Sequence, residues 1–130
     1  MSNRVVAHFL DGQVLKGASF DVSLTKETCH VQTPTGPVEV RLSELKALFF
    51  VKDLIGNPAR QEGRTIAAGD ARAVGGRRVE IQFKDGEQLV GLTPSYRPDQ
   101  QFFYIMPADS ESNNIRILVN RAATSSVQFP

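Results

Sequence analysis

Apolar and polar residues alternate along most of this chain. Every second residue from Val5 to Phe9 is apolar, and the same holds from Val79 to Phe83. A period of two places the apolar side chains on one face of a β-strand, where they can be buried while the other face stays in water. The pattern therefore predicts an all-β fold made of short, half-buried strands.

Both of these strands run into an Asp-Gly pair, at residues 11–12 and 85–86, and then into a short return strand that ends in glycine. The segments Arg4–Gly17 and Arg78–Gly91 share Arg, Val, Phe, Asp, Gly and Leu at one constant offset. Asp-Gly between alternating segments predicts a hairpin with a type I′ turn, because both residues tolerate positive φ. Gly17 lies within an otherwise continuous strand, which predicts a bulge or a sharp bend. The chain is thus predicted to contain an internal repeat.

The remainder of each repeat follows the same order: a third strand, a fourth strand, a helical turn and a fifth strand. In the first repeat the fifth strand is Lys46–Val51. The segment Leu42–Leu54 also fits a helix with Ser43 as its N-cap. We favour one helical turn followed by a strand, because the run Phe-Phe-Val is short and typical of a pleated surface.

A segment of different character separates the repeats. It is rich in glycine and has little apolar periodicity, which is typical of a connector. The predicted organisation is a first repeat over residues 1–54, a Gly/Arg-rich connector over 55–76 and a second repeat over 77–130.

The first hairpin motif, Val79-x-Ile81-x-Phe83-x-Asp85-Gly86-x-x-Leu89-x-Gly91, resembles that of Sm-like proteins, and residues 5–17 carry a second copy. The resemblance implies tandem SH3-like/Sm-like barrels, with short helical turns. RNA-binding Sm-like proteins have Asp followed by Met-Asn in the loop after the second strand, and neither repeat keeps these residues. The whole chain also resembles a family of uncharacterised bacterial proteins built from two such repeats.

Arginines cluster in and beside the connector. Guanidinium groups bind phosphate as a rigid two-pronged donor, so the cluster suggests an anion or nucleotide site. The candidate residues are Arg60, Arg64, Arg77 and Arg78. The alternative is a solvated linker that its charges keep soluble.

Apolar residues on the second face of a strand suggest a contact surface, and the alternative is isolated surface aliphatics. In the first repeat Val6 and Leu10 occupy the face that is polar in the second repeat, and both faces of residues 47–51 are apolar. Since a half-exposed strand would alternate, we expect this last segment to lie between the barrels or in a dimer contact. Phe49 and Phe50 are expected to point to opposite sides of one strand. The candidate interface residues are Val6, Leu10, Leu48 and Phe50.

Net charge, cysteine content and the length of apolar runs limit the classes of partner and the compartment that we expect. A net charge of +1 gives no overall field that would attract nucleic acid or an anionic membrane. The single cysteine, Cys29, fits a reducing compartment, and no run approaches the roughly 18 apolar residues of a membrane span. We expect a cytoplasmic protein.

No catalytic, metal-binding or cofactor motif is recognisable, and His8 and His30 lie on different predicted strands. The sequence therefore predicts a non-enzymatic binding or adaptor module for protein–protein contacts, with a protein partner or self-association and no cofactor. The alternative is a nucleotide- or RNA-binding domain that uses the connector arginines.

Overall fold

A computed structural model of the chain describes residues 3–56, 61–94 and 96–130. It confirms the all-β prediction. The strands are β1 Asn3–Phe9, β2 Val14–Ser19, β3 Thr28–Thr33, β4 Gly36–Arg41, β5 Leu45–Val51, β6 Arg77–Phe83, β7 Gln88–Thr93, β8 Phe102–Pro107, β9 Asn114–Asn120 and β10 Thr124–Gln128. Three single-turn 3-10 helices complete the described part of the chain: η1 Leu42–Glu44, η2 Ala71–Ala73 and η3 Arg121–Ala123.

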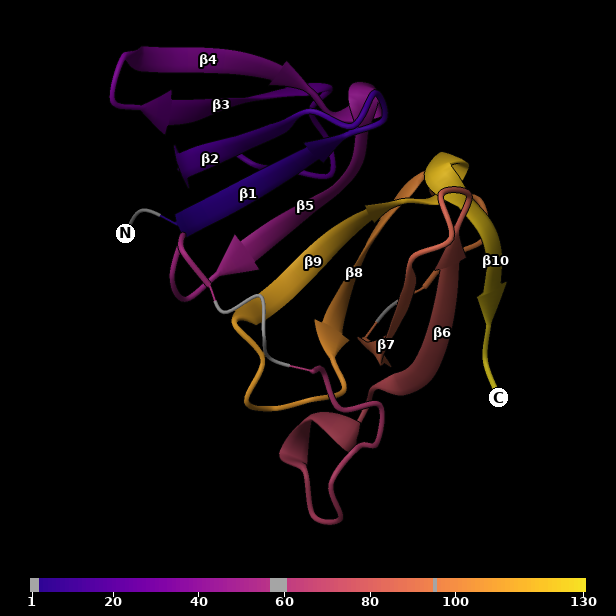
Figure 1. Ribbon diagram of the computed structural model, residues 1–130. Coiled ribbons are helices and arrows are strands. Elements are labelled where there is room, and N and C mark those ends of the chain that lie inside the picture. The colour runs from indigo at the N-terminus through magenta and orange to yellow at the C-terminus, as the bar shows by residue number, and fades with distance from the viewer. Residues whose placement is uncertain (1–2, 57–60, 95) are drawn as a thin grey trace.

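The ten strands form one antiparallel sheet in the order β10-β6-β7-β8-β9-β5-β1-β2-β3-β4. Strands β1–β5 and strands β6–β10 follow the same order within their halves, and β5 and β9 lie side by side in the middle of the molecule (Figure 1). At this junction Leu48 pairs with Leu118 and Phe49 with Ile117. The sequence predicted tandem SH3-like/Sm-like barrels; the described strands form one continuous sheet that is not closed.

The sheet encloses two hydrophobic cores, one in each half. The first-half core includes Val5, Ala7 and Phe50, and the second-half core includes Phe83, Ile105 and Phe49. Strand β5 therefore contributes to both cores, which explains why its apolar residues do not alternate with polar ones. Helix η1 turns the chain into β5, and the expectation of one helical turn followed by a strand is confirmed.

The Asp-Gly hairpins are confirmed, but their turn type is different. Gly12 and Gly86 have φ values of 92° and 97°, and no described residue other than glycine has a positive φ. A type I′ turn needs positive φ at two positions. The amide of Phe9 instead donates to the Gln13 carbonyl and that of Gly12 to the Phe9 carbonyl, which makes a three-residue loop with glycine last. The carboxylate of Asp11 accepts from the Gln13 amide at 2.9 Å, so aspartate is selected as an acceptor rather than for its φ.

Gly17 and Gly91 are required by crowding rather than by a bulge. The β1·β2 register passes through Gly17 without a shift. A Cβ at Gly17 would lie 2.2 Å from the Gln32 carbonyl oxygen, and one at Gly91 would lie 2.2 Å from that of Met106. Only glycine allows the neighbouring backbone to come this close.

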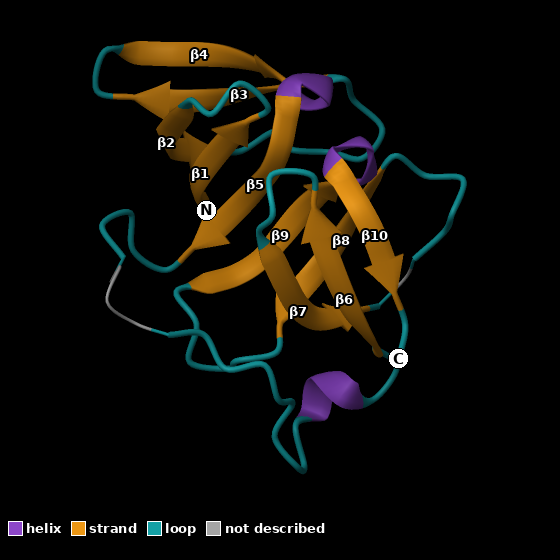
Figure 2. Ribbon diagram, turned by 45° about the vertical axis from the view of Figure 1, so that its right-hand side comes forward, coloured by secondary structure: helices purple, strands orange, loops and turns teal. Residues whose placement is uncertain are grey.

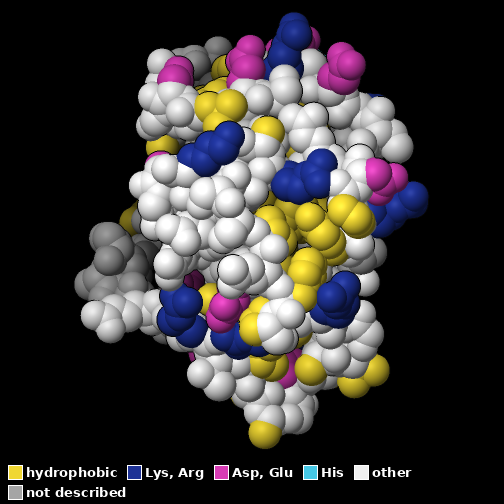
Figure 3. All heavy atoms as spheres, turned by 90° about the vertical axis from the view of Figure 1, so that its right-hand side faces the viewer, with side chains coloured by type: hydrophobic (Ala, Val, Ile, Leu, Met, Phe, Trp, Pro, Cys, Tyr) yellow, Lys and Arg dark blue, Asp and Glu magenta, His cyan; other side chains and the backbone are white. Residues whose placement is uncertain are grey.

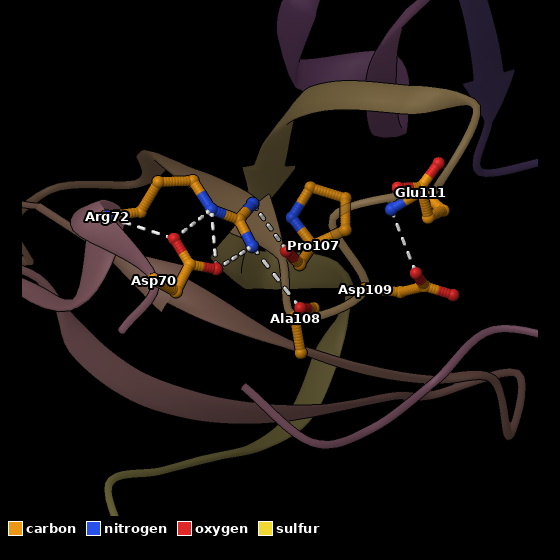
Figure 4. Close-up of polar contacts among 6 residues, drawn as sticks. All are labelled: Asp70, Arg72, Pro107, Ala108, Asp109 and Glu111. Carbon is orange, nitrogen blue, oxygen red and sulfur yellow. Dashed lines mark hydrogen bonds and ion pairs between the residues drawn. The ribbon is translucent and has the colours of Figure 1, made fainter. Parts of the chain in front are cut away.

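The connector is anchored through Arg72 of the short helix η2, which lies outside the sheet (Figure 2). Asp70 caps η2 by accepting from the Arg72 amide, and its carboxylate pairs with the Arg72 guanidinium at 2.7 Å. The same guanidinium donates to the carbonyls of Pro107 and Ala108 at the end of β8 (Figure 4). Hydrogen bonds from Arg72, chiefly those of its side chain, hold the pKa of Asp70 below its usual value. This arginine is thus a structural clamp between the connector and the second half.

Candidate functional site

The arginines predicted to bind an anion make intramolecular contacts in the described part of the chain. Arg64 donates to the Gln88 side chain, Arg77 lies over the Phe129 ring at 4.1 Å, and Arg78 pairs with Glu80 at 3.0 Å. Arg78 also donates to the Arg64 carbonyl. Arg60 lies outside the described residues. Arg64, Arg77 and Arg78 are therefore each engaged in intramolecular contacts, with Arg78 touching the backbone of Arg64, and the nucleotide- or RNA-binding alternative stays a prediction.

Basic side chains are also dispersed on the face that is turned to the viewer in Figure 3. Lysine and arginine side chains lie there among acidic and apolar ones and do not gather into one patch (Figure 3). Binding of a nucleic-acid backbone depends on several cationic side chains along one path. This face does not present such a path.

The four candidate interface residues lie in different surroundings. Val6 is buried against the second-half core, so the face it occupies contacts the other half of the same chain. Leu48 and Phe50 are buried in the first-half core at the junction. Leu10 is exposed beside the cavity between the two Asp-Gly turns, which is also lined by Lys46 and Asp85. The contact with a partner protein that these residues were proposed to make remains a prediction.

Phe50 and Phe49 do point to opposite sides of β5. Phe50 belongs to the first-half core and Phe49 to the second-half core. On the Phe50 side, the guanidinium of Arg116 lies 4.3 Å from the Phe50 ring centre and 4.5 Å from that of Tyr104. A cation over two rings adds attraction to the apolar contact between the halves.

On the Phe49 side, the surface is hollowed into an open groove of about 620 Å³, which we call the junction groove. Its walls are the β1–β2 hairpin, the end of β5 and the loop at residues 53–56. Phe49 and Val51 form its floor, and the exposed side chains of Val14 and Ile55 stand on its rim. The His8 ring packs edge-on against Phe49, with ring centres 4.7 Å apart.

A smaller cavity of about 260 Å³, the inner pocket, shares Phe49, Glu62, Glu87 and Asn114 with the junction groove. Its lining includes aliphatic residues of the second-half sheet and the connector residues Glu62–Arg64. The connector is held in place there because Ser112 donates to Glu62 and the Gly63 amide donates to Asp109 at 2.9 Å. The groove and the pocket together offer an apolar surface with a polar margin.

The charges around the groove differ in how they are satisfied. Lys46 forms ion pairs with Asp85, at 2.7 Å, and with Glu87, which fixes the β6–β7 turn against the first half. Desolvation acts to lower the pKa of Lys46, but hydrogen bonds to these two carboxylates outweigh it and the pKa is raised. Burial lowers the pKa of His8, so its imidazole is neutral at neutral pH.

The remaining histidine, cysteine and carboxylate side chains bear on metal binding and nucleophilic chemistry. Within residues 3–56, 61–94 and 96–130, no three His, Cys, Asp or Glu side chains are grouped as metal ligands. His30 pairs with Asp21 at 2.7 Å on the outside of the first half, and Cys29 is buried. Burial raises the pKa of the Cys29 thiol, which makes it unreactive.

The sequence located part of this site and missed part of it. The doubly apolar β5 signalled a contact surface, and Phe49 is the residue through which that surface reaches the groove. Val14 and Glu62 were not singled out, because an exposed valine on a hairpin and a glutamate in a connector carry no local signal. They become neighbours only through the pairing of β5 with β9.

Comparisons with known proteins add the family. No helix within the described residues is long and apolar enough to cross a membrane. Neither the curated proteins nor the solved structures include a significant match to this chain. The model of a family of unknown function, DUF6982, matches residues 1–129, so the chain belongs to that family.

Proposed function

We propose that this protein is a non-enzymatic binding module that takes up a segment of a partner protein in the junction groove. The observation that carries the proposal is the groove itself, an open apolar hollow bordered by charged side chains at the contact between the two halves. Sites of this kind, with an apolar centre and a polar margin, are typical of protein recognition surfaces.

The aliphatic residues on the rim support a protein partner. Val14 is 51% exposed and Ile55 is 85% exposed, and both line the same groove. Apolar side chains grouped at one hollow bury area when a partner covers them, whereas single exposed aliphatics elsewhere are ordinary. The inner pocket, at about 260 Å³, lies below the usual 300 to 1,000 Å³ of small-molecule sites and suits a single side chain.

We further infer that the two halves are tandem SH3-like/Sm-like units joined edge to edge. The identical strand order in the two halves and the glycines at matching crowded positions support this relation. In this view the groove arises because joining the units brings the outer face of the first hairpin against the second unit. An adaptor function follows from a site that neither unit would form alone.

The proposal is tested by selecting binders from a random peptide display library on the purified protein. Selected peptides are then titrated against wild type, Val14→Arg and Val38→Arg by fluorescence polarisation. Val38 is the matched control, since it is an exposed valine on the edge strand β4. We expect peptides that keep their affinity for Val38→Arg and lose at least about tenfold with Val14→Arg, because the longer, charged arginine side chain at the rim would obstruct the groove that the peptide fills.

Two results would contradict the proposal. One is that repeated selection enriches no peptide. The other is that enriched peptides bind wild type and Val14→Arg equally well, which would place their site elsewhere.

A further inference from the structure

The carboxylates at the junction groove are not equally neutralised. Glu87 is paired with Lys46. Asp53 accepts from the Ile55 amide, and Glu62 accepts from the Ser112 hydroxyl, but no cation of the described residues forms an ion pair with either. The one lysine in the groove lining, Lys16, donates to the Leu54 carbonyl.

The balance of charge at the groove is therefore acidic. Apart from Glu87, which Lys46 neutralises, two carboxylates, those of Asp53 and Glu62, line it against Lys16, and His8 adds no charge at neutral pH. The apolar floor lowers the local polarisability, so these charges act more strongly on a bound group than on an ion in free water. Complementary charge on a partner raises both its rate of encounter and its selectivity.

Apolar and acidic side chains line the same two cavities. Phe49 and Glu62 both line the groove and also the inner pocket, so an aromatic ring and a carboxylate border the same two cavities. One segment with an apolar and a polar side chain next to each other is sufficient to contact both Phe49 and Glu62.

From this arrangement we propose that the partner segment carries a large apolar side chain next to a lysine or arginine. The apolar side chain lies over Phe49, and the cation lies against Glu62 and Asp53. This inference rests on the proposed function, because it specifies the chemistry of the segment that the groove binds.

The experiment uses three synthetic peptides of equal length that differ only in a central pair: Phe-Lys, Phe-Glu and Ala-Lys. Each is titrated into the full-length ¹⁵N-labelled protein at low salt and followed by amide chemical shifts. We expect Phe-Lys to shift the amides of Val14, Phe49 and Glu62. Phe-Glu should bind roughly two- to fivefold more weakly, the range expected of one ion pair at a partly exposed rim. Ala-Lys should bind more weakly still, because it lacks the apolar contact.

A charge exchange makes the test specific to the groove. Glu62→Lys should reverse the preference, so that Phe-Glu binds better than Phe-Lys. The control is Glu39→Lys, which changes the net charge by the same amount on β4, at a side chain that is 66% exposed. The control should keep the wild-type preference, and added salt should reduce that preference in both wild type and control.

The outcomes separate the two proposals. If no peptide shifts groove amides, both the proposed function and this inference are overturned. If Phe-Lys and Phe-Glu bind the groove equally, or Phe-Glu binds better to wild type, only this inference is overturned. If groove amides shift with protein concentration and no peptide present, a second copy of the chain is the occupant, and this inference is wrong.

Discussion

The internal junction and the two free edges of the sheet are built on the same plan but from different residues. Counted from the preceding short helix, Phe49 of β5 corresponds to Gln128 of β10, and Ala47 corresponds to Ser126. Counted back from the following short helix, Leu118 of β9 corresponds to Glu39 of β4. The junction positions are buried, whereas Gln128 and Glu39 are exposed.

The difference in residue type between the junction and the edges explains where the sheet continues and where it ends. A free strand edge can pair with another chain unless polar side chains or proline discourage it. The β4 edge carries Glu39 and Pro37, and the β10 edge carries Ser126 and Gln128. The apolar pairing that joins the halves is thus confined to the centre, and the ends remain polar.

The largest effect is expected from removing the aromatic side chain at the junction. Phe49→Ala should lower the free energy of unfolding by about 3–5 kcal/mol, because it leaves a cavity in the second-half core. Gln128→Ala, at the corresponding edge position, should change it by less than about 0.5 kcal/mol. Urea denaturation followed by circular dichroism measures both. Equal losses would show that the junction is no more important than the edge.

Giving the free edges the residues of the junction should remove the difference between them. A variant with Pro37→Arg, Glu39→Leu, Ser126→Ala and Gln128→Phe should associate through β4 and β10, as β9 and β5 do within the chain. Sedimentation velocity should show assemblies at micromolar concentration that wild type does not form. The control with Glu39→Gln and Ser126→Thr keeps the edges polar and should sediment as wild type does. A junction-like variant that sediments no faster would refute the role assigned to these residues.

A smaller effect is expected from the cation between the halves. Arg116→Gln removes the guanidinium that lies on the Phe50 and Tyr104 rings and should cost about 0.5–2 kcal/mol. Arg41→Gln, on the exposed edge of β4, should cost less than about 0.5 kcal/mol. Thermal unfolding of the two variants side by side distinguishes a junction contact from general loss of charge. The same melting temperature for both variants would show that the Arg116 guanidinium does not stabilise the junction.

The smallest effect should depend on pH. The hydrogen bond from Lys46 holds the pKa of Asp85 below its ordinary value. A carboxylate with a depressed folded-state pKa stabilises the fold above the unfolded pKa, about 3.9, and this contribution is lost as the pH falls through the lower folded value. Lys46→Met should therefore melt slightly below wild type at pH 7 and together with it near pH 2. A difference that persists undiminished at pH 2 would assign the effect to packing against Phe83 instead.

Much of the strand pattern was predictable from the sequence because burial of one face imposes a period of two. The helical turn before β5 was also predictable, since Phe-Phe-Val does not suit a continued helix. The turn type was not, because Asp-Gly fits both a two-residue loop and a three-residue loop, and the hydrogen bond from Phe9 to Gln13 decides between them.

The open sheet and the groove could not be predicted for a related reason. Alternation determines which face of a strand is buried but does not name the strand beside it. The apolar residues on both sides of β5 signalled a contact, yet the partner, β9, is far along the chain. Glu62 reaches the groove because Ser112 and Asp109 hold the connector there.

Amide hydrogen exchange tests directly whether β5 and β9 join the two halves into one sheet with its most stable part at the junction. We expect the amides of Leu48, Phe49 and Leu118 to exchange among the slowest in the molecule, while exposed amides of β4 and β10 exchange much faster. This expectation would be contradicted if the β5 and β9 amides exchanged as fast as those of the edges while the remaining strands of each half stayed protected.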